Sequence, residues 1–70
     1  MIVTIKETGE EKELRLVENG MDVSNDLIGM FGGGKEMDWE SYQMWKQAFD
    51  NSKTYAEAYD YVTLEYGWQC

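Results

Sequence analysis

Carboxylates are the side chains of this sequence that could carry catalysis. The chain of 70 residues has 14 aspartates and glutamates and no histidine. Two carboxylates held close together can serve as a general acid and a general base. A chain with 14 acids contains close pairs by chance, however. A chain of 70 residues also leaves little room for a pocket that excludes water. Cys70, the only thiol, has no histidine to activate it. We therefore expect no enzymatic activity.

Two short stretches match ligand-binding loops only in part. In FGGGKE, residues 31–36, the lysine is followed by Glu36, where a Walker loop needs a hydroxyl for magnesium. A carboxylate at that position repels phosphate. DVSND, residues 22–26, puts oxygen ligands at positions 1, 3 and 5 of a calcium loop. Leu27 and Gly33 then stand where that loop needs glycine and glutamate. The sequence predicts neither a metal site nor a cofactor.

Acids and aromatic rings gather in the C-terminal stretch TYAEAYDYVTLEYGW, residues 54–68, which contains no lysine, arginine or histidine. On a helix, the 3.6-residue period assigns one face to the core: Tyr55, Ala58, Tyr59, Val62 and Tyr66. A second face of the same helix carries apolar side chains: Tyr61, Leu64 and Trp68. Three carboxylates share this helix: Glu57, Asp60 and Glu65.

A second acidic cluster stands at the start of the preceding predicted helix. Glu36, Asp38 and Glu40 lie close together there. Trp39 stands among them and lies off the apolar stripe of its helix. We expect part of this apolar surface to stay exposed, because a hairpin cannot cover two faces of several helices.

A surface of acids and aromatic rings is suited to binding a protein. Tyrosine and tryptophan give large contact areas at low entropic cost, and exposed apolar patches mark interaction sites. Carboxylates attract a groove lined by lysine and arginine. They can stand where a nucleic-acid-binding protein expects phosphates, or they can serve only to keep the protein in solution. The residues leave both interpretations open.

The net charge of −8 narrows the class of partner. It repels nucleic acid and anionic membranes, so we expect a basic protein as partner and no direct contact with either. Disordered acidic chains are poor in aromatic residues, whereas this one is 43% hydrophobic and 14% aromatic. We expect a single folded domain over residues 1–70. The chain shows no signal-peptide pattern and no membrane-spanning apolar run, which predicts a cytoplasmic protein.

An N-terminal β-hairpin is predicted over residues 2–18. Apolar and polar side chains alternate in IVTIK and again in ELRLVE. Pairing Val3 with Leu16 and Ile5 with Leu14 puts the apolar set on one face. That register makes Gly9-Glu10 a two-residue type II′ turn. It also places opposite charges across the strands, Lys6 opposite Glu13 and Glu7 opposite Lys12.

Helices are predicted over residues 22–31, 38–51 and 54–66, so that one short and two longer helices pack on the hairpin in an α+β fold. Asp22 or Ser24, Asp38 and Thr54 are their candidate N-caps. Two alternatives stay open. Asn19-Gly20 is a turn signal that could launch a third strand at residues 21–23, and residues 61–66 are rich enough in β formers to be a strand.

In size, charge and aromatic content the chain resembles small acidic proteins of phages and mobile elements, including anti-CRISPR and antirestriction proteins. VTIKETGEEKELRL and DLIG, residues 3–16 and 26–29, are also similar to the start of uncharacterised small proteins of bacterial mobile elements. The first resemblance implies a non-enzymatic inhibitor that occupies the basic groove of a CRISPR effector nuclease or, second, a restriction enzyme, in the host cytoplasm if a phage encodes it. The alternative is an acidic interaction or assembly module without mimicry, which could form a homodimer.

Overall fold

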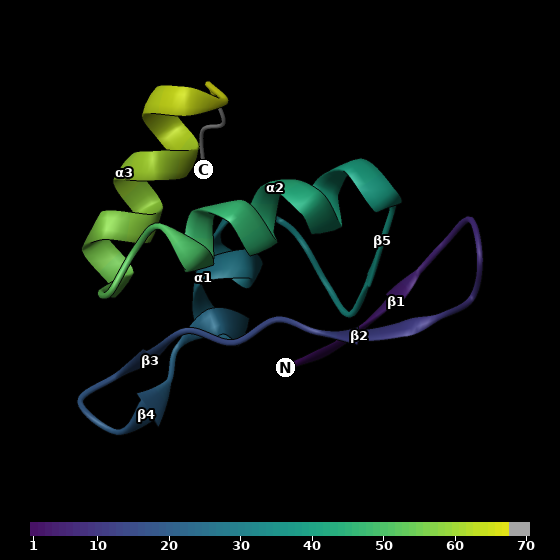
Figure 1. Cartoon of the computed structure of the whole chain (residues 1–70), viewed down its shortest axis with the longest axis horizontal. Helices are drawn as coiled ribbons and strands as arrows, with labels where there is room; N and C mark the ends of the chain where they lie inside the picture. The colour runs from purple at the N-terminus through teal and green to yellow at the C-terminus, as the bar shows by residue number, and fades with distance from the viewer. Residues whose placement is uncertain (68–70) are drawn as a thin grey trace.

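A computed structural model of the chain describes residues 1–67 and shows the predicted α+β fold (Figure 1). Five short strands and three helices follow in the order β1 (Ile2–Ile5), β2 (Glu11–Glu13), β3 (Val17–Glu18), β4 (Met21–Asp22), α1 (Ser24–Met30), β5 (Glu36–Met37), α2 (Trp39–Asp50) and α3 (Tyr55–Glu65). A three-stranded sheet has the order β2-β1-β5, and β3 pairs with β4. Trp68 and Cys70 lie outside the described residues.

The register predicted for the first hairpin is wrong. Val3 pairs with Lys12 and Thr4 with Glu11, so the two predicted leucine pairings and the two predicted charge pairings do not form. Gly9, with φ of +74°, closes a longer loop, where its N–H donates to the Ile5 carbonyl at 2.7 Å. An even shift of register keeps every side chain on its face, so hydrophobic alternation cannot distinguish the two pairings.

The sheet has a third strand, β5, that was not predicted from the sequence. β5 runs parallel to β1, with Ile5 opposite Met37. The Thr4 N–H donates to the Lys35 carbonyl at 2.6 Å, and the Lys6 N–H donates to the Met37 carbonyl at 2.9 Å. A strand of two residues leaves no periodic signal in the sequence. β5 matters here because it places the start of α2 beside the hairpin loop.

The Asn19-Gly20 turn forms a second hairpin. Both residues have positive φ, 53° and 78°, as a type I′ turn requires. The third-strand alternative therefore holds for Met21 and Asp22, and the helix predicted from residue 22 begins at Ser24. It ends where Gly32, with φ of +80°, donates its N–H to the Gly29 carbonyl, as in a Schellman motif.

The two longer helices follow their local signals. The Asp38 side chain accepts a hydrogen bond from the Ser41 N–H at 3.0 Å, and α2 starts directly after it. The Thr54 hydroxyl accepts from the Glu57 N–H at 3.2 Å at the start of α3. Residues 61–65 are helical, so the strand alternative there is wrong. At these ends, side chains satisfy the amides that a helix leaves without partners.

The core lies between the sheet, α1 and the inner faces of α2 and α3. Trp45 is its largest fully buried side chain, and its ring meets Phe31 edge-on at 5.6 Å. Leu14 and Leu16 are buried despite the changed register. Tyr66 was expected in the core but is 38% exposed. Its hydroxyl donates to Gln47 Oε1 at 2.7 Å instead. Figure 1 shows α3 rising from the end of α2 that lies away from β5.

Candidate partner-binding surface

The outer face of α3 brings together the acids and apolar residues predicted for it. Five of them line one shallow surface depression of about 280 Å³: Glu57, Asp60, Tyr61, Leu64 and Glu65. The loop between α2 and α3 completes the lining with Asn51 and Ser52. The Leu64 side chain is 81% exposed, which is high for a large apolar residue, and the three carboxylates are exposed beside it.

Burial of the opposite face holds α3 in this orientation. Ala58 and Val62 are fully buried against the core, so the helix cannot turn without exposing them. Thr54 and Glu57 form the N-terminal cap, where the Thr54 hydroxyl also lies 3.4 Å from Glu57 Oε1. Glu57 therefore serves the fold as well as the surface. Asp60 and Glu65 lie further along the helix, beyond the cap.

Tyr61 forms the half-buried part of this face. Its ring lies 5.9 Å from that of Tyr66. Partial desolvation, together with the nearby Tyr66 and Glu65, raises the pKa of the Tyr61 phenol above its ordinary value. A hydrogen bond with the Tyr66 side chain contributes to this shift, so the Tyr61 hydroxyl is already engaged within the protein.

The second acidic cluster mainly serves the start of α2. The Asp38 carboxylate caps the helix, and hydrogen bonds from the Ser41 side chain and backbone lower the pKa of Asp38. Glu7, in the β1–β2 loop, accepts from the Trp39 N–H at 3.0 and 3.2 Å through its two oxygens. This role of Glu7 could not be predicted from the sequence, because 32 residues separate the partners. Glu36 and Glu40 are exposed beside them.

The structure does not join the two acidic clusters into one site. They lie at opposite ends of α2, whose 12 residues span about 18 Å at 1.5 Å per residue. A partner could touch both only by covering the length of that helix. Because Asp38 is already engaged by Ser41, the α3 face is the better candidate site.

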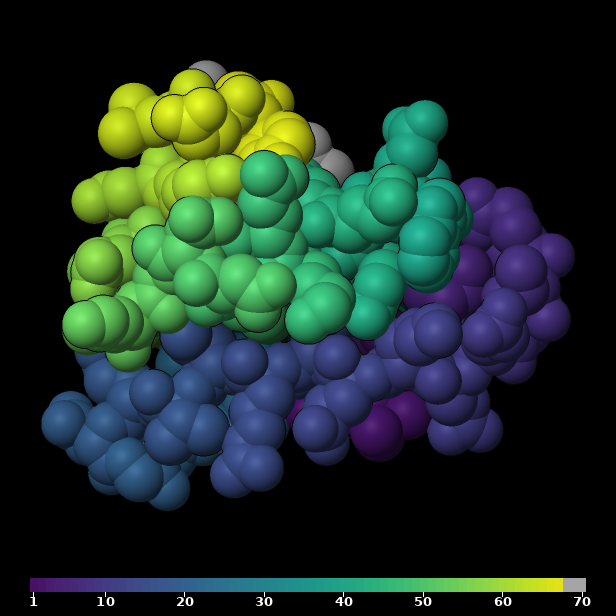
Figure 2. All heavy atoms as spheres, in the orientation of Figure 1, coloured from purple at the N-terminus to yellow at the C-terminus, as the bar shows by residue number. Residues whose placement is uncertain are grey.

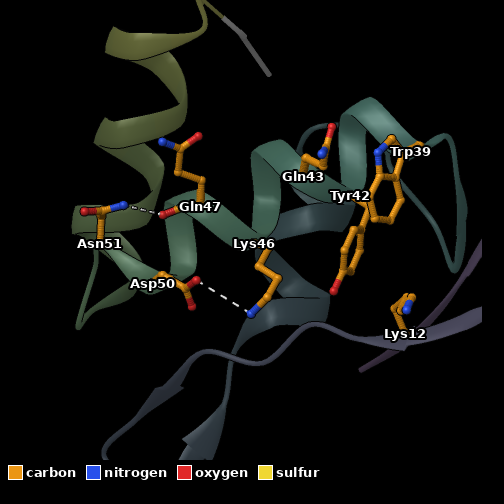
Figure 3. A pocket seen from close by; sticks show the side chains of 8 residues that line it. All are labelled: Lys12, Trp39, Tyr42, Gln43, Lys46, Gln47, Asp50 and Asn51. Carbon is orange, nitrogen blue, oxygen red and sulfur yellow. Dashed lines mark hydrogen bonds and ion pairs between the residues drawn. The ribbon is translucent and has the colours of Figure 1, made fainter.

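A groove along α2 separates the two clusters (Figure 3). Its volume is about 440 Å³, and its lining comes from α2, from the residue after it and from β2: Lys12, Trp39, Tyr42, Gln43, Lys46, Gln47, Asp50 and Asn51. Trp39 and Tyr42 stack at 5.4 Å with 22° between their rings. Figure 3 shows both rings above Lys12 of β2.

Of the groove residues, only Trp39 was predicted from the sequence as part of a binding surface. The helical residues recur at steps of three and four from position 39 to position 50, which is the signal of a shared helix face. Apart from Trp39 and Tyr42 they are polar, and a polar stripe on a helix is typical of an ordinary solvent-facing surface. Lys12 joins them only through the fold, because β2 lies beside α2, as the space-filling view shows (Figure 2).

In the part of the chain that the structure describes, residues 1–67, no three or more histidine, cysteine, aspartate or glutamate side chains are grouped so that they could hold a metal ion. None of its helices has the length and apolar character needed to cross a membrane.

Comparison of the chain with protein-family models, with curated proteins and with solved structures found no match.

Proposed function

We propose that this protein is a non-enzymatic inhibitor that binds a nucleic-acid-handling bacterial protein by occupying its basic groove. It would act in the cytoplasm of the host cell. The observation that carries the proposal is the α3 face, where Glu57, Asp60 and Glu65 surround the exposed Leu64 in one depression. A CRISPR effector nuclease is the first target to test and a restriction enzyme the second.

The spacing of the three carboxylates supports mimicry of a phosphate backbone. Along the helix axis, Asp60 follows Glu57 by about 4.5 Å and Glu65 follows Asp60 by about 7.5 Å, at 1.5 Å per residue. One strand of a DNA duplex advances about 3.4 Å per phosphate. The face therefore presents roughly half the linear charge density of a strand. Leu64 and Tyr61 add apolar contact area that a phosphate backbone lacks.

The test is a charge reversal on α3. Glu57→Lys, Asp60→Lys and Glu65→Lys together should abolish inhibition of DNA cleavage by the target. Each desolvated pair that is lost costs about 2–5 kcal/mol, whereas a rim charge costs under 1. The double variant with only Asp60→Lys and Glu65→Lys leaves the cap at Thr54 intact and should weaken binding by at least about 10²-fold.

The matched control changes the same total charge elsewhere. Glu11→Lys, Glu13→Lys and Asp26→Lys alter exposed residues, and Asp26 stands in the first turn of α1 as Glu57 does in α3. This control triple should inhibit as the wild type does. Mimicry is wrong if the α3 and control triples behave alike, or if the target binds DNA and this protein at the same time. Loss only on reversal of Glu36 and Glu40 would move the site to the start of α2.

The second candidate function is an acidic interaction or assembly module without mimicry. The exposure of Leu64 favours it, because an apolar side chain that is 81% exposed adds nothing to phosphate resemblance. On this view the apolar contact supplies the affinity and the carboxylates give specificity. Leu64→Ala would then weaken partner binding more than Asp60→Lys, and the mimic predicts the reverse order.

A further inference from the structure

The α2 groove brings two lysines and one carboxylate together beside the stacked rings of Trp39 and Tyr42. It contains Lys12 and Lys46, two of the six basic residues of the chain. Their present partners are Glu10, 3.3 Å from Lys12, and Asp50, 3.6 Å from Lys46. Exposed ion pairs of this kind contribute little to stability, so both lysines can be recruited by carboxylates of a partner.

The groove continues into the acidic face of α3. Asn51 lines the groove and also lines the depression of the α3 face. From that shared point, the groove follows α2 for about 18 Å, and the acidic face follows α3 for about 12 Å from Glu57 to Glu65, at 1.5 Å per residue. Figure 2 shows the two helices side by side on one side of the molecule. The two lysines and one carboxylate of the groove thus adjoin the three carboxylates of the α3 face.

We propose that the α2 groove is the docking site for the α3 face of a second copy of this chain. The groove and the acidic face start from one point on the same surface. A two-fold axis that bisects the angle between them brings each of these strips of one copy onto the other strip of the second copy. Such an axis lays the α3 face of each copy along the groove of the other. The result is a closed, isologous dimer, the commonest form of symmetric assembly.

Charge and apolar contact agree in this arrangement. Asp60 and Glu65 of one copy meet Lys12 and Lys46 of the other. Leu64, which is 81% exposed, is the apolar side chain available to cover Trp39, which is 42% exposed at the open end of its stack with Tyr42. A standard interface buries about 800 Å² on each partner, which is under a fifth of the 4514 Å² exposed by this chain.

The net charge of −8 on each copy opposes association, and ionic strength separates that repulsion from the local attraction. At 0.01 M salt the Debye length is about 30 Å, so charges across both copies repel. At 0.15 M it is about 8 Å, so the long-range repulsion is screened while charges in contact still interact. The dimer should therefore be tighter at 0.15 M than at 0.01 M salt.

The proposed dimer does not depend on the proposed function, but it would affect that function. The second copy covers the same α3 face that a basic groove would take, so a target and a second copy compete for it. Dilution would then favour inhibition. The self-association experiment needs no target, and the cleavage assay needs no dimer, so either idea can fail alone.

The experiment is sedimentation equilibrium of the whole protein at 0.15 M salt, from about 5 to 500 µM, a range that covers dissociation constants typical of weak dimers. The wild type should be a dimer at the upper end. Lys12→Glu with Lys46→Glu should weaken association by at least about tenfold, and Asp60→Lys with Glu65→Lys should do the same. An equimolar mixture of these two variants should associate again as a heterodimer. In one half of its interface the new glutamates of the groove face the new lysines of α3, and the other half keeps the wild-type charges.

Two controls carry the same changes in net charge at other sites. Lys35→Glu with Lys53→Glu matches the first variant, and Glu11→Lys with Glu13→Lys matches the second. Both should associate within about threefold of the wild type, and circular dichroism should show every variant folded. A wild type that is monomeric at 500 µM overturns the proposal. So does a dimer that neither variant weakens, or a mixture of variants that stays monomeric.

Discussion

Asp22 is the residue on which several parts of the fold depend. Its Oδ1 accepts hydrogen bonds from the Ser24 N–H at 3.0 Å and from the Ser24 hydroxyl at 2.6 Å. Its Oδ2 lies 3.1 Å from the ammonium of Met1. Burial acts to raise the pKa of Asp22, but these hydrogen bonds and the ammonium charge outweigh it and lower the pKa to about 2. The carboxylate of Asp22, at the end of β4, therefore contacts both the residue before β1 and the first residue of α1.

The depressed pKa of Asp22 predicts a loss of stability in acid. Its stabilising contribution is complete above the ordinary pKa of 3.8 and disappears as the pH falls to about 2. We expect about 1 kcal/mol from this group, because its side chain is 35% exposed and solvent screens the charge. Urea unfolding between pH 5 and pH 2 should show a smaller decrease in the free energy of unfolding for Asp22→Asn than for the wild type. Equal decreases would contradict this role.

At the scale of elements, the start of α2 depends on two carboxylates from different parts of the chain. Asp38 is the local cap and binds the Ser41 N–H. Glu7 reaches the Trp39 N–H from the hairpin loop. Carboxylates at a helix N-terminus satisfy free amides and complement the helix dipole. This second contact also fixes the hairpin loop against the helix that carries the groove.

The contact of Glu7 with α2 can be tested by substitution. Glu7→Ala should lower the free energy of unfolding by about 1 kcal/mol, the usual effect of losing a capping side chain. Glu7→Gln keeps an acceptor oxygen and should recover part of this loss. Glu11→Ala, on the exposed edge of β2, is the control and should change little. Glu7→Ala and Glu11→Ala variants of equal stability would show that Glu7 does not hold the helix.

At the scale of the whole molecule, a modest core works against a large net charge. The radius of gyration of 11.2 Å shows a compact chain on which 14 acids and 6 bases are crowded. A domain of this size has only a few kcal/mol of stability. Repulsion among the surplus carboxylates therefore takes away a measurable part of it.

Salt should raise the melting temperature by screening this repulsion. Between 0.01 M and 0.15 M sodium chloride we expect an increase of about 4–8 °C, the shift that corresponds to roughly 1 kcal/mol in a domain of this size. Circular dichroism melting curves at low protein concentration measure it without a contribution from dimers. The variant with Glu11→Lys and Glu13→Lys carries less net charge and should respond less. A melting temperature that does not change with salt would refute the argument.

Features that depend on neighbours along the chain could be predicted from the amino-acid sequence. Asp38 and Thr54 cap their helices, and Asn19-Gly20 forms its turn, because each acts on residues within four positions. The helical period likewise places Glu57, Asp60 and Tyr61 on one side of α3 with Leu64, and Glu65 follows Leu64 in the chain. The α3 part of the candidate site was predictable for the same reason.

Features that join residues far apart in the chain became apparent only in the folded protein. The hairpin register shifted by an even step, which hydrophobic alternation cannot detect. β5 pairs with β1 across the chain, and Glu7 meets α2 only because that pairing sets the helix beside the hairpin loop. The α2 groove depends on Lys12 of β2 lying next to a polar helix face. Contacts of this kind are selected by the packing of the whole core, and no local pattern of residue types encodes them.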